Sequence, residues 1–439
     1  MTRPQLAEFM RRMEPCSVAI IPAAREVTRS HDTEYRFRQD SDFYYLTGFR
    51  EPDAVAVVAP GREKPFTLFV RPRDREKEIW TGRRAGVEGA KDRYGADEAF
   101  PIEELDAKLA EILDGARSLY YRLGAGHPDL DQTVIGRLAR MRTMGRRGVR
   151  VPQSIVDPAG LIHEMRLVKS DEEVALMRRS AEIAAEAHRE AMRAARPGMK
   201  EYEVEALIEY VFRRGGAAAP AYNSIVGSGA NATILHYVEN DAELRDGDLL
   251  LIDAGAEYEG FASDITRTFP VNGRFNDAQR DLYQLVLDCQ EECIRMVRPG
   301  VTLDEMHQRS VEILTEGMVR LGLLKGEPAQ LIEEEAYKKF YMHRLGHYLG
   351  MDVHDAGPYH LDDRPRPVEP GIVITVEPGL YVSEDAEEIP EQYRGLGVRI
   401  EDDVLVTAEG YDVLTRNAPK HVDEIEALMQ ESRRSSPTR

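Results

Sequence analysis

Short apolar runs alternate with helically spaced apolar residues along the first third of the chain. The runs Ser17–Ala23, Ala54–Ala59 and Phe66–Val70 are rich in Val, Ile and Phe and are bounded by Pro or Gly, as buried strands are. Apolar residues recur at helical intervals between Ile102 and Leu113, which predicts a helix, and Thr133–Met141 predicts another. Strands that alternate with helices indicate a mixed sheet covered by helices, and therefore an α/β domain.

The pattern changes where the first third of the chain ends. Val156–Gly160 contains the Pro and Gly of a turn, and Ser170 with Glu173 forms a capping-box pattern at the start of a long amphipathic helix. We place a domain boundary here. The chain is predicted to contain an N-terminal α/β domain over residues 1–165 and a second domain over residues 166–439.

The second domain contains a weak internal repeat. Arg196–Met199 and Arg298–Val301 each follow a long helical pattern, and each precede an acidic amphipathic segment. Further along, Arg245–Asp253 and Glu369–Glu377 both lead from a Gly turn into an apolar strand that ends on a carboxylate. Two copies of helix–helix–strand–strand, related by a pseudo-two-fold axis, would bring carboxylates together on facing strands.

Composition and charge argue against several classes of protein. The chain of 439 residues has 58 basic and 78 acidic residues, a net charge of −20 that disfavours nucleic acid as a partner. It has no run of about 18 apolar residues for a membrane span, and its first ten residues lack the apolar core of a secretory signal. Its three cysteines are too few for a disulfide framework, so we expect a cytoplasmic protein with no membrane partner.

Residues that can bind metals or move protons gather near the predicted strand ends. They are Asp253, Asp264, His343, His347, His354, Glu377 and Glu401. A donor set rich in oxygen and poor in nitrogen suits hard or borderline divalent ions such as Mn²⁺, and carboxylates can bridge two such ions. A strand-end carboxylate is more often a cap or turn residue, so the residues alone leave that interpretation and a two-metal site both open.

Short segments around these residues follow a familiar order. They are Asn223–Gly229, Ile234–Tyr237, Leu251–Glu257, Ser263–Phe269, Met342–Asp355, Val376–Val382 and Gly397–Asp403, with Arg38–Asp53 in the first domain. In this order they resemble the pita-bread metallopeptidases, and within them the Xaa-Pro aminopeptidases (aminopeptidase P), over about residues 170–415. The resemblance implies an α/β (α+β) fold, with a C-terminal pita-bread domain whose two halves are related by a pseudo-two-fold axis.

The resemblance also implies two divalent metal ions, Mn²⁺ above all, and five ligands. The ligands are Asp253, Asp264, His347, Glu377 and Glu401. Asp264 and Glu401 would bridge both ions. Asp253 would complete one ion, and His347 with Glu377 would complete the other. Ions held in this way turn a shared water into a bridging hydroxide nucleophile, and Glu377 would carry the proton to the leaving amine.

Further residues are assigned to the substrate by the same resemblance. His236 and His354 would donate hydrogen bonds to the substrate carbonyl and to the tetrahedral oxyanion. His343, Tyr381 and Arg399 would line the pocket on the C-terminal side of the scissile bond.

Three residues leave alternatives open. Arg399 could instead orient Glu401, from which only two positions separate it. Trp80, the only tryptophan, could form an apolar wall of the substrate site from another subunit, or could serve packing alone. Arg344 stands where the family usually has Gly, and could alter the pocket or add an ion pair.

The expected activity is hydrolysis of the first peptide bond in peptides with proline at the second position. The N-terminal domain is expected to assemble a homodimer or homotetramer and to contribute a pocket wall. A prolidase, which prefers Xaa-Pro dipeptides, shares the ligands and the fold, but the residues Arg36–Asp53 favour the aminopeptidase. Methionine aminopeptidase is disfavoured because its usual form lacks such a first domain. Creatinase-like hydrolysis uses no metal, and it is disfavoured because all five ligand positions are intact. A non-catalytic binding protein is a remote alternative, because such relatives usually lose ligands.

Overall fold

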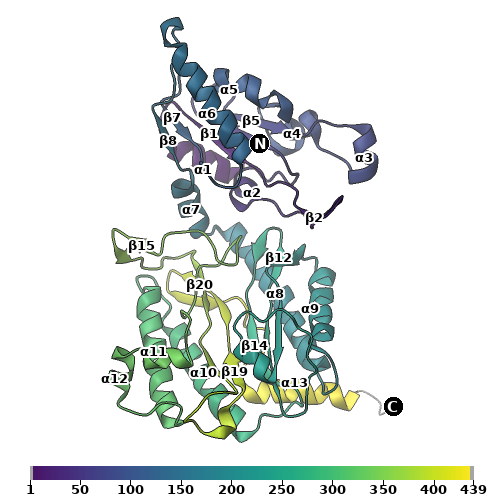
Figure 1. Ribbon diagram of the computed structural model, residues 1–439, viewed down its shortest axis with the longest axis vertical. Coiled ribbons are helices and arrows are strands. Elements are labelled where there is room, and N and C mark those ends of the chain that lie inside the picture. The colour runs from purple at the N-terminus through teal and green to yellow at the C-terminus, as the bar shows by residue number, and fades with distance from the viewer. Residues whose placement is uncertain (1–2, 436–439) are drawn as a thin grey trace. The chain divides into compact units, whose positions relative to one another are not determined.

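The chain folds into two compact units, each with its own β-structure and core (Figure 1). The computed structural model describes residues 3–435. One unit is Met1–Arg166 and the other is Leu167–Arg439. Among the described helices, none is both long enough and apolar enough to cross a membrane.

The first unit is built on a mixed six-stranded sheet, as the sequence predicts. In spatial order its strands are β6 (Glu98–Pro101), β5 (Phe66–Val70), β4 (Val55–Val58), β1 (Ser17–Pro22), β7 (Ser118–Tyr120) and β8 (Ser154–Val156). β4 is antiparallel to both β1 and β5, whereas β1–β7, β5–β6 and β7–β8 are parallel pairs. All but the last residue of β1 is buried, which requires cover on both faces of the sheet.

Helices supply that cover. Those of the first unit are α1 (Pro4–Arg12), α2 (Ser41–Thr47), α3 (Arg75–Thr81), α4 (Gly86–Tyr94), α5 (Leu105–Leu113) and α6 (Pro128–Thr143), while α7 (Ala159–Leu167) spans the division between the units. Leu109 of α5 and Val134 of α6 pack in one core cluster with Val18 and Val57 of the sheet. The predicted helix between Ile102 and Leu113 is therefore confirmed, with its first turn formed as a 3-10 helix, η1 (Ile102–Glu104).

The second unit contains the predicted repeat. Its first copy has α8 (Asp171–Ala194), α9 (Glu201–Gly215), β11 (Leu249–Asp253) and β14 (Thr266–Pro270), and its second copy has α10 (Asp277–Met296), α11 (Leu303–Arg320), β17 (Val373–Val376) and β20 (Asp402–Thr407). β11 pairs antiparallel with β14, as β17 does with β20. β10 (Ile225–Ser228) adds a third strand to the first pair, and β21 (Gly410–Val413) adds one to the second.

Shorter elements complete this unit. They are β9 (Ala219–Pro220), β12 (Ala256–Tyr258), β13 (Phe261–Ala262), β15 (His360–Leu361), β16 (Arg364–Pro365), β18 (Gly379–Val382), β19 (Leu396–Arg399), α12 (Pro328–Glu333), α13 (Val422–Ser435) and the 3-10 turn η3 (Gly229–Thr233). α8 begins with the predicted capping box, in which Ser170 and Glu173 satisfy each other's backbone N–H groups.

Antiparallel pairing places the predicted carboxylates in two sets. Asp253 is the last residue of β11, and Asp264 lies two residues before its partner strand β14. Glu377 directly follows β17, and Glu401 directly precedes its partner strand β20. Each strand pair therefore presents two carboxylates at the same end.

A buried charge network lies directly next to Glu401 in the sequence. Asp402 pairs with Arg267 at 2.7 Å, and both side chains are fully buried. Lys420 reaches the other carboxylate oxygen at 2.8 Å, and Gln290 and Thr415 donate further hydrogen bonds. Although burial alone would raise it, these two cations hold the pKa of Asp402 below its ordinary value. The network ties β14, β20 and α10 together behind the strand ends.

Replacing Arg267 should destabilise this unit strongly. Arg267→Met leaves Asp402 buried with only part of its compensation, and removing one partner of a buried pair costs about 3–5 kcal/mol. The surface variant Arg295→Ala, which loses exposed pairs with Glu291 and Glu292, should change stability by less than about 1 kcal/mol. Thermal melts of both variants against the wild type measure this difference. Equal melting temperatures for the two variants would contradict it.

Candidate metal centre and active-site pocket

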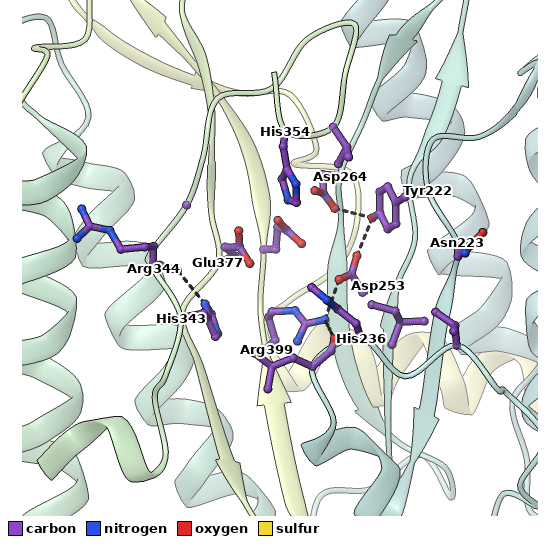
Figure 2. A pocket seen from close by; sticks show the side chains of 16 residues that line it. Tyr222, Asn223, His236, Asp253, Asp264, His343, Arg344, His354, Glu377 and Arg399 are labelled. Atoms are coloured by element: carbon purple, nitrogen blue, oxygen red, sulfur yellow. Dashed lines mark hydrogen bonds and ion pairs between the residues drawn. The ribbon is translucent and has the colours of Figure 1, made fainter. Parts of the chain in front are cut away.

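The second unit contains a pocket of about 460 Å³ into which the four strand-end carboxylates point. Figure 2 shows its lining, which also includes Tyr222, His236, His343, His354 and Arg399. The lining residues all belong to the second unit. The two halves of the repeat thus meet at one cavity.

Three predicted ligands form a group that can hold a cation. Asp264, His347 and Glu401 each offer one donor atom, and these atoms all lie within 4.8 Å of one another. Glu377 is adjacent, because its Oε1 lies 3.4 Å from Nε2 of His347. Nδ1 of His347 is 3.0 Å from the carbonyl oxygen of Tyr348, an arrangement that keeps a proton on Nδ1 and directs Nε2 toward the carboxylates.

Asp253 is joined to this group through hydrogen bonds. The hydroxyl of Tyr222 is 2.6 Å from Oδ1 of Asp253 and also reaches Oδ1 of Asp264, so it bridges the two carboxylates. Arg399 donates to Oδ2 of Asp253 at 2.7 Å. Figure 2 shows Tyr222, Asp253 and Asp264 gathered on one side of the pocket.

The electrostatics of the group call for a cation. Burial raises the pKa values of Asp264 and Glu401, and neighbouring carboxylates raise them further. Burial likewise raises the pKa of Glu377 to about 7. Burial alone would lower the pKa of His347, but Asp264 and Glu377 raise it to about 9. A divalent ion would replace that proton and compensate the carboxylates, so the donor set fits such an ion.

Threonine hydroxyls hold two of the carboxylates in place. Thr266 donates to Oε2 of Glu401 at 2.7 Å, and Thr375 donates to Oε1 of Glu377 at 3.2 Å. Sequence reasoning missed both threonines, as well as Tyr222. Tyr222 and Thr266 are distant in sequence from the carboxylates that they contact, and Thr375 sits in a strand whose pattern shows only burial. The spacing of residues therefore gave no signal for these three.

The histidines predicted to act on the substrate carbonyl are exposed to the pocket. His354 lies next to the metal group, with its ring centroid 4.4 Å from that of His347. Burial of part of the ring lowers the pKa of His354. His236 lies on the irregular segment that follows η3, and Figure 2 shows it close to Asp253 and Arg399.

The residues predicted for the C-terminal side of the scissile bond form one connected wall. The Tyr381 hydroxyl is 2.8 Å from Nε2 of His343 and accepts a hydrogen bond from Arg399 at 2.9 Å. Burial lowers the pKa of His343 to about 4, so its ring is neutral. Arg399 donates to Asp253, Tyr381 and Thr266, and Thr266 in turn donates to Glu401. The alternative in which Arg399 orients Glu401 stays a prediction, with Thr266 as the intermediate. Strand β19 ends at Arg399, so the alternation that would put Glu401 on the same face does not continue.

The two remaining predicted residues are Trp80 and Arg344. Trp80 is on α3 of the first unit, where its side chain is 87% exposed. Arg344 lines the pocket and forms an ion pair with Asp304 of α11, which is the ion pair considered for this departure from the family pattern. In Figure 2, Arg344 lies beyond His343, away from the carboxylates.

Comparison with known proteins identifies matching families for both units. The profile of metallopeptidase family M24 matches residues 175–408, and the profile of the aminopeptidase P N-terminal domain matches residues 3–120. The first match contains every carboxylate of the pocket. The second contains the segment Arg38–Asp53.

Individual proteins match over nearly their whole length. The chain is 49% identical over 436 residues to the Xaa-Pro aminopeptidase of Escherichia coli, covering 97% of this chain and 98% of that protein. It is 45% identical to the Xaa-Pro aminopeptidase of Haemophilus influenzae, covering 95% and 94%. The structure of the aminopeptidase PepP of Pseudomonas aeruginosa superposes with a TM-score of 0.96 at 50% identity, covering 98% of both chains. The structure of zinc-substituted E. coli aminopeptidase P in complex with product superposes with a TM-score of 0.94 at 48% identity. The match covers 98% of this chain and 97% of that chain.

The link from Arg399 to Asp253 leads to a prediction on cation affinity. Arg399→Lys keeps the charge but loses the planar fork that contacts Asp253, Tyr381 and Thr266 together. We expect the affinity for Mn²⁺, measured by calorimetric titration of metal-free protein, to fall about 10–100-fold, as for other residues that orient a ligand. The exposed Arg394→Lys should leave the affinity unchanged. Equal affinities for the two variants would show that Arg399 does not organise the ligand.

Proposed function

The chain belongs to metallopeptidase family M24, and we propose that its pocket removes the first residue of peptides that carry proline second. The chain is a hydrolase of the Xaa-Pro aminopeptidase type that uses divalent metal and acts on peptides. The observation that carries this assignment is the convergence of Asp264, His347 and Glu401 within 4.8 Å beside the pocket. Binding of product by zinc-substituted aminopeptidase P, 48% identical to this chain, supports it.

The proposed centre holds two Mn²⁺ ions. Asp264 and Glu401 would be shared ligands in this proposal, and with His347 they offer donor atoms within 4.8 Å of one another. Asp253 would hold one ion, and His347 with Glu377 would hold the other. When bound, the ions lower the pKa of water and polarise the substrate carbonyl. The negative charge of the four carboxylates would offset the repulsion between two dications.

The side chains then move the protons. Glu377 faces the shared space of the donor group, with Oε1 3.4 Å from Nε2 of His347, so it can take a proton from the attacking water. The same carboxyl group passes the proton to the proline nitrogen as it leaves. His236 and His354, both exposed to the pocket, donate hydrogen bonds to the carbonyl oxygen, whose negative charge grows during attack.

The pocket wall formed by His343, Tyr381 and Arg399 would accommodate the proline ring of the substrate. The peptide bond that precedes proline has no N–H group. A site that paired its substrate with the edge of a sheet would therefore lack one backbone hydrogen-bond donor at this position. The connected side chains of His343, Tyr381 and Arg399 instead offer a rigid, partly aromatic surface for the ring. The free α-amino group of the substrate would face the carboxylate side of the pocket.

The remaining assignments concern assembly and place in the cell. We propose a cytoplasmic homodimer or homotetramer, formed through the N-terminal domain of residues 1–165, in which Trp80 walls the pocket of another copy. The 87% exposed side chain of Trp80 supports a contact outside its own unit. Three free cysteines, Cys16, Cys289 and Cys293, suit a reducing compartment.

Product analysis tests the activity directly. Mn²⁺-loaded protein should release the first residue from Xaa-Pro-Xaa tripeptides much faster than it cleaves Xaa-Pro dipeptides, and should leave Met-Ala-Ser intact. Mass spectrometry of parallel digests separates the three substrates. Cleavage of the dipeptides alone would make the protein a prolidase, which the relatives do not favour.

Removal of a ligand tests the metal centre. Glu401→Gln keeps the shape of the side chain but removes the charge that would bridge the ions. We expect kcat/KM for a tripeptide to fall by more than about 100-fold, with a loss of bound Mn²⁺ measured by elemental analysis. His360→Ala, on the exposed strand β15, provides the control and should retain both metal and activity. Full activity in a Glu401→Gln protein would exclude the proposed centre.

A further inference from the structure

His236 has no direct support for its ring. Its side chain is exposed to the pocket, and within residues 3–435 no group hydrogen-bonds the imidazole. It lies between η3 and β11, in a stretch without strand or helix. The orientation of a side chain without hydrogen-bond partners depends mainly on the backbone that carries it. The position of His236 must therefore be fixed by its neighbours in the sequence.

One buried carboxylate holds the whole segment around His236. Oε1 of Glu201 accepts hydrogen bonds from the backbone N–H and the hydroxyl of Ser228, both at 2.7 Å, and from Asn231 at 3.2 Å. Oε2 accepts from the hydroxyl of Tyr237 at 2.8 Å and from the N–H of Ala242 at 2.9 Å. These five donors lie before, beside and after His236.

The far end of the segment has a second anchor. Asn240 adopts a left-handed backbone conformation, with φ of 49°, and its side chain accepts from the N–H of Val226 and donates to the carbonyl of Ser224, both at 2.9 Å. Both partners flank or belong to strand β10. The segment thus replaces a regular hydrogen-bond ladder with buried side chains. Of the two anchors, only Glu201 contacts a neighbour of His236, and the other neighbour, Leu235, accepts a longer bond from Arg399 at 3.4 Å.

The charge of Glu201 is compensated without a cation. Glu201 is completely buried, and among the described residues none forms an ion pair with it. It is the first residue of α9, where unpaired N–H groups favour negative charge. Burial and the bond to Glu201 raise the pKa of Tyr237 to about 12, so its hydroxyl stays a donor at neutral pH. A carboxylate with this many donors resists displacement more strongly than a neutral acceptor would.

We propose that Glu201 and Tyr237 are positioning residues for catalysis. They hold the backbone of His236 in the position from which its ring meets the substrate carbonyl. The inference rests on the proposed function, in which His236 stabilises the developing oxyanion. Tyr237 is the residue next to His236, so the bond from its hydroxyl to Glu201 sets the local backbone. Without that bond the segment can shift, and a displacement of about 1 Å at a catalytic group can cost on the order of 100-fold in rate.

The test compares two tyrosine hydroxyls. Tyr237→Phe removes the bond beside His236, whereas Tyr121→Phe removes a similar bond, from Tyr121 to Asp131 at 2.5 Å, in the first unit. With the Mn²⁺-loaded enzyme and an Xaa-Pro-Xaa tripeptide, Tyr237→Phe should lower kcat about 10–100-fold. KM and bound Mn²⁺ should stay near their wild-type values. Tyr121→Phe should leave kcat unchanged.

A double-mutant cycle separates positioning from general loosening. Once His236→Ala has removed the ring, adding Tyr237→Phe should change kcat less than about twofold, because there is no longer a ring to misplace. Equal effects of Tyr237→Phe in the two backgrounds would overturn the inference. An unchanged kcat in Tyr237→Phe alone would overturn it as well.

A second variant covers the case in which Tyr237→Phe does not fold. Glu201→Gln keeps the volume of the side chain but presents an amide group to donors, so it too should lower kcat and leave bound Mn²⁺ intact. Failure of the proposed function is recognised separately, because wild-type enzyme would then cleave no tripeptide. If wild type cleaves and His236→Ala retains full kcat, the role of His236 fails, and the inference fails with it.

Discussion

The convergence of four carboxylates in one partly buried place is the constraint around which the second unit is organised. Asp253, Asp264, Glu377 and Glu401 repel one another, and burial adds to the cost of their charge. Among the residues that the structure describes, only Arg399 contributes a permanent positive charge in direct contact, through Asp253. The unit therefore needs bound cations to relieve the repulsion, and a folded scaffold that holds the carboxylates together before the cations arrive.

The scaffold achieves this with a duplicated design that is not copied in every detail. In the second copy the carboxylates directly flank their paired strands, whereas in the first copy Asp264 lies two residues outside β14. In the first copy the backbone at residue 255 lies close to Ser263, next to Asp264. This approach requires glycine, because a Cβ at Gly255 would lie 1.7 Å from the carbonyl oxygen of Ser263. Next to Glu401 in the sequence, Asp402 forms ion pairs with Arg267 and Lys420, which compensate its charge so that it does not add to the charge of the pocket.

Local patterns in the sequence predicted the parts of the structure that local physics determines. Strand ends, the capping box at Ser170 and the order helix–helix–strand–strand depend on residues close in sequence, and they are confirmed. Tyr222, Thr266 and Glu201 depend on partners that only the folded chain brings near, so no spacing could reveal them. Arg399 is connected to Glu401 through Thr266 rather than directly, because a separation of two residues implies a shared face only while the strand continues.

The same physics explains how the two exposed histidines are supported. In the proposed function both rings must reach the substrate, so their nitrogens are not available for bonds to the protein and their rigidity has to come from the adjacent backbone. His236 is followed by Tyr237, whose hydroxyl is held by buried Glu201. His354 is followed by Asp355, which is paired with Lys169 at 2.9 Å, with both side chains 1% exposed. In each case the residue after the imidazole is tied to a buried, charged side chain, Glu201 for Tyr237 and Lys169 for Asp355, so the backbone beside the ring is held without using the ring nitrogens.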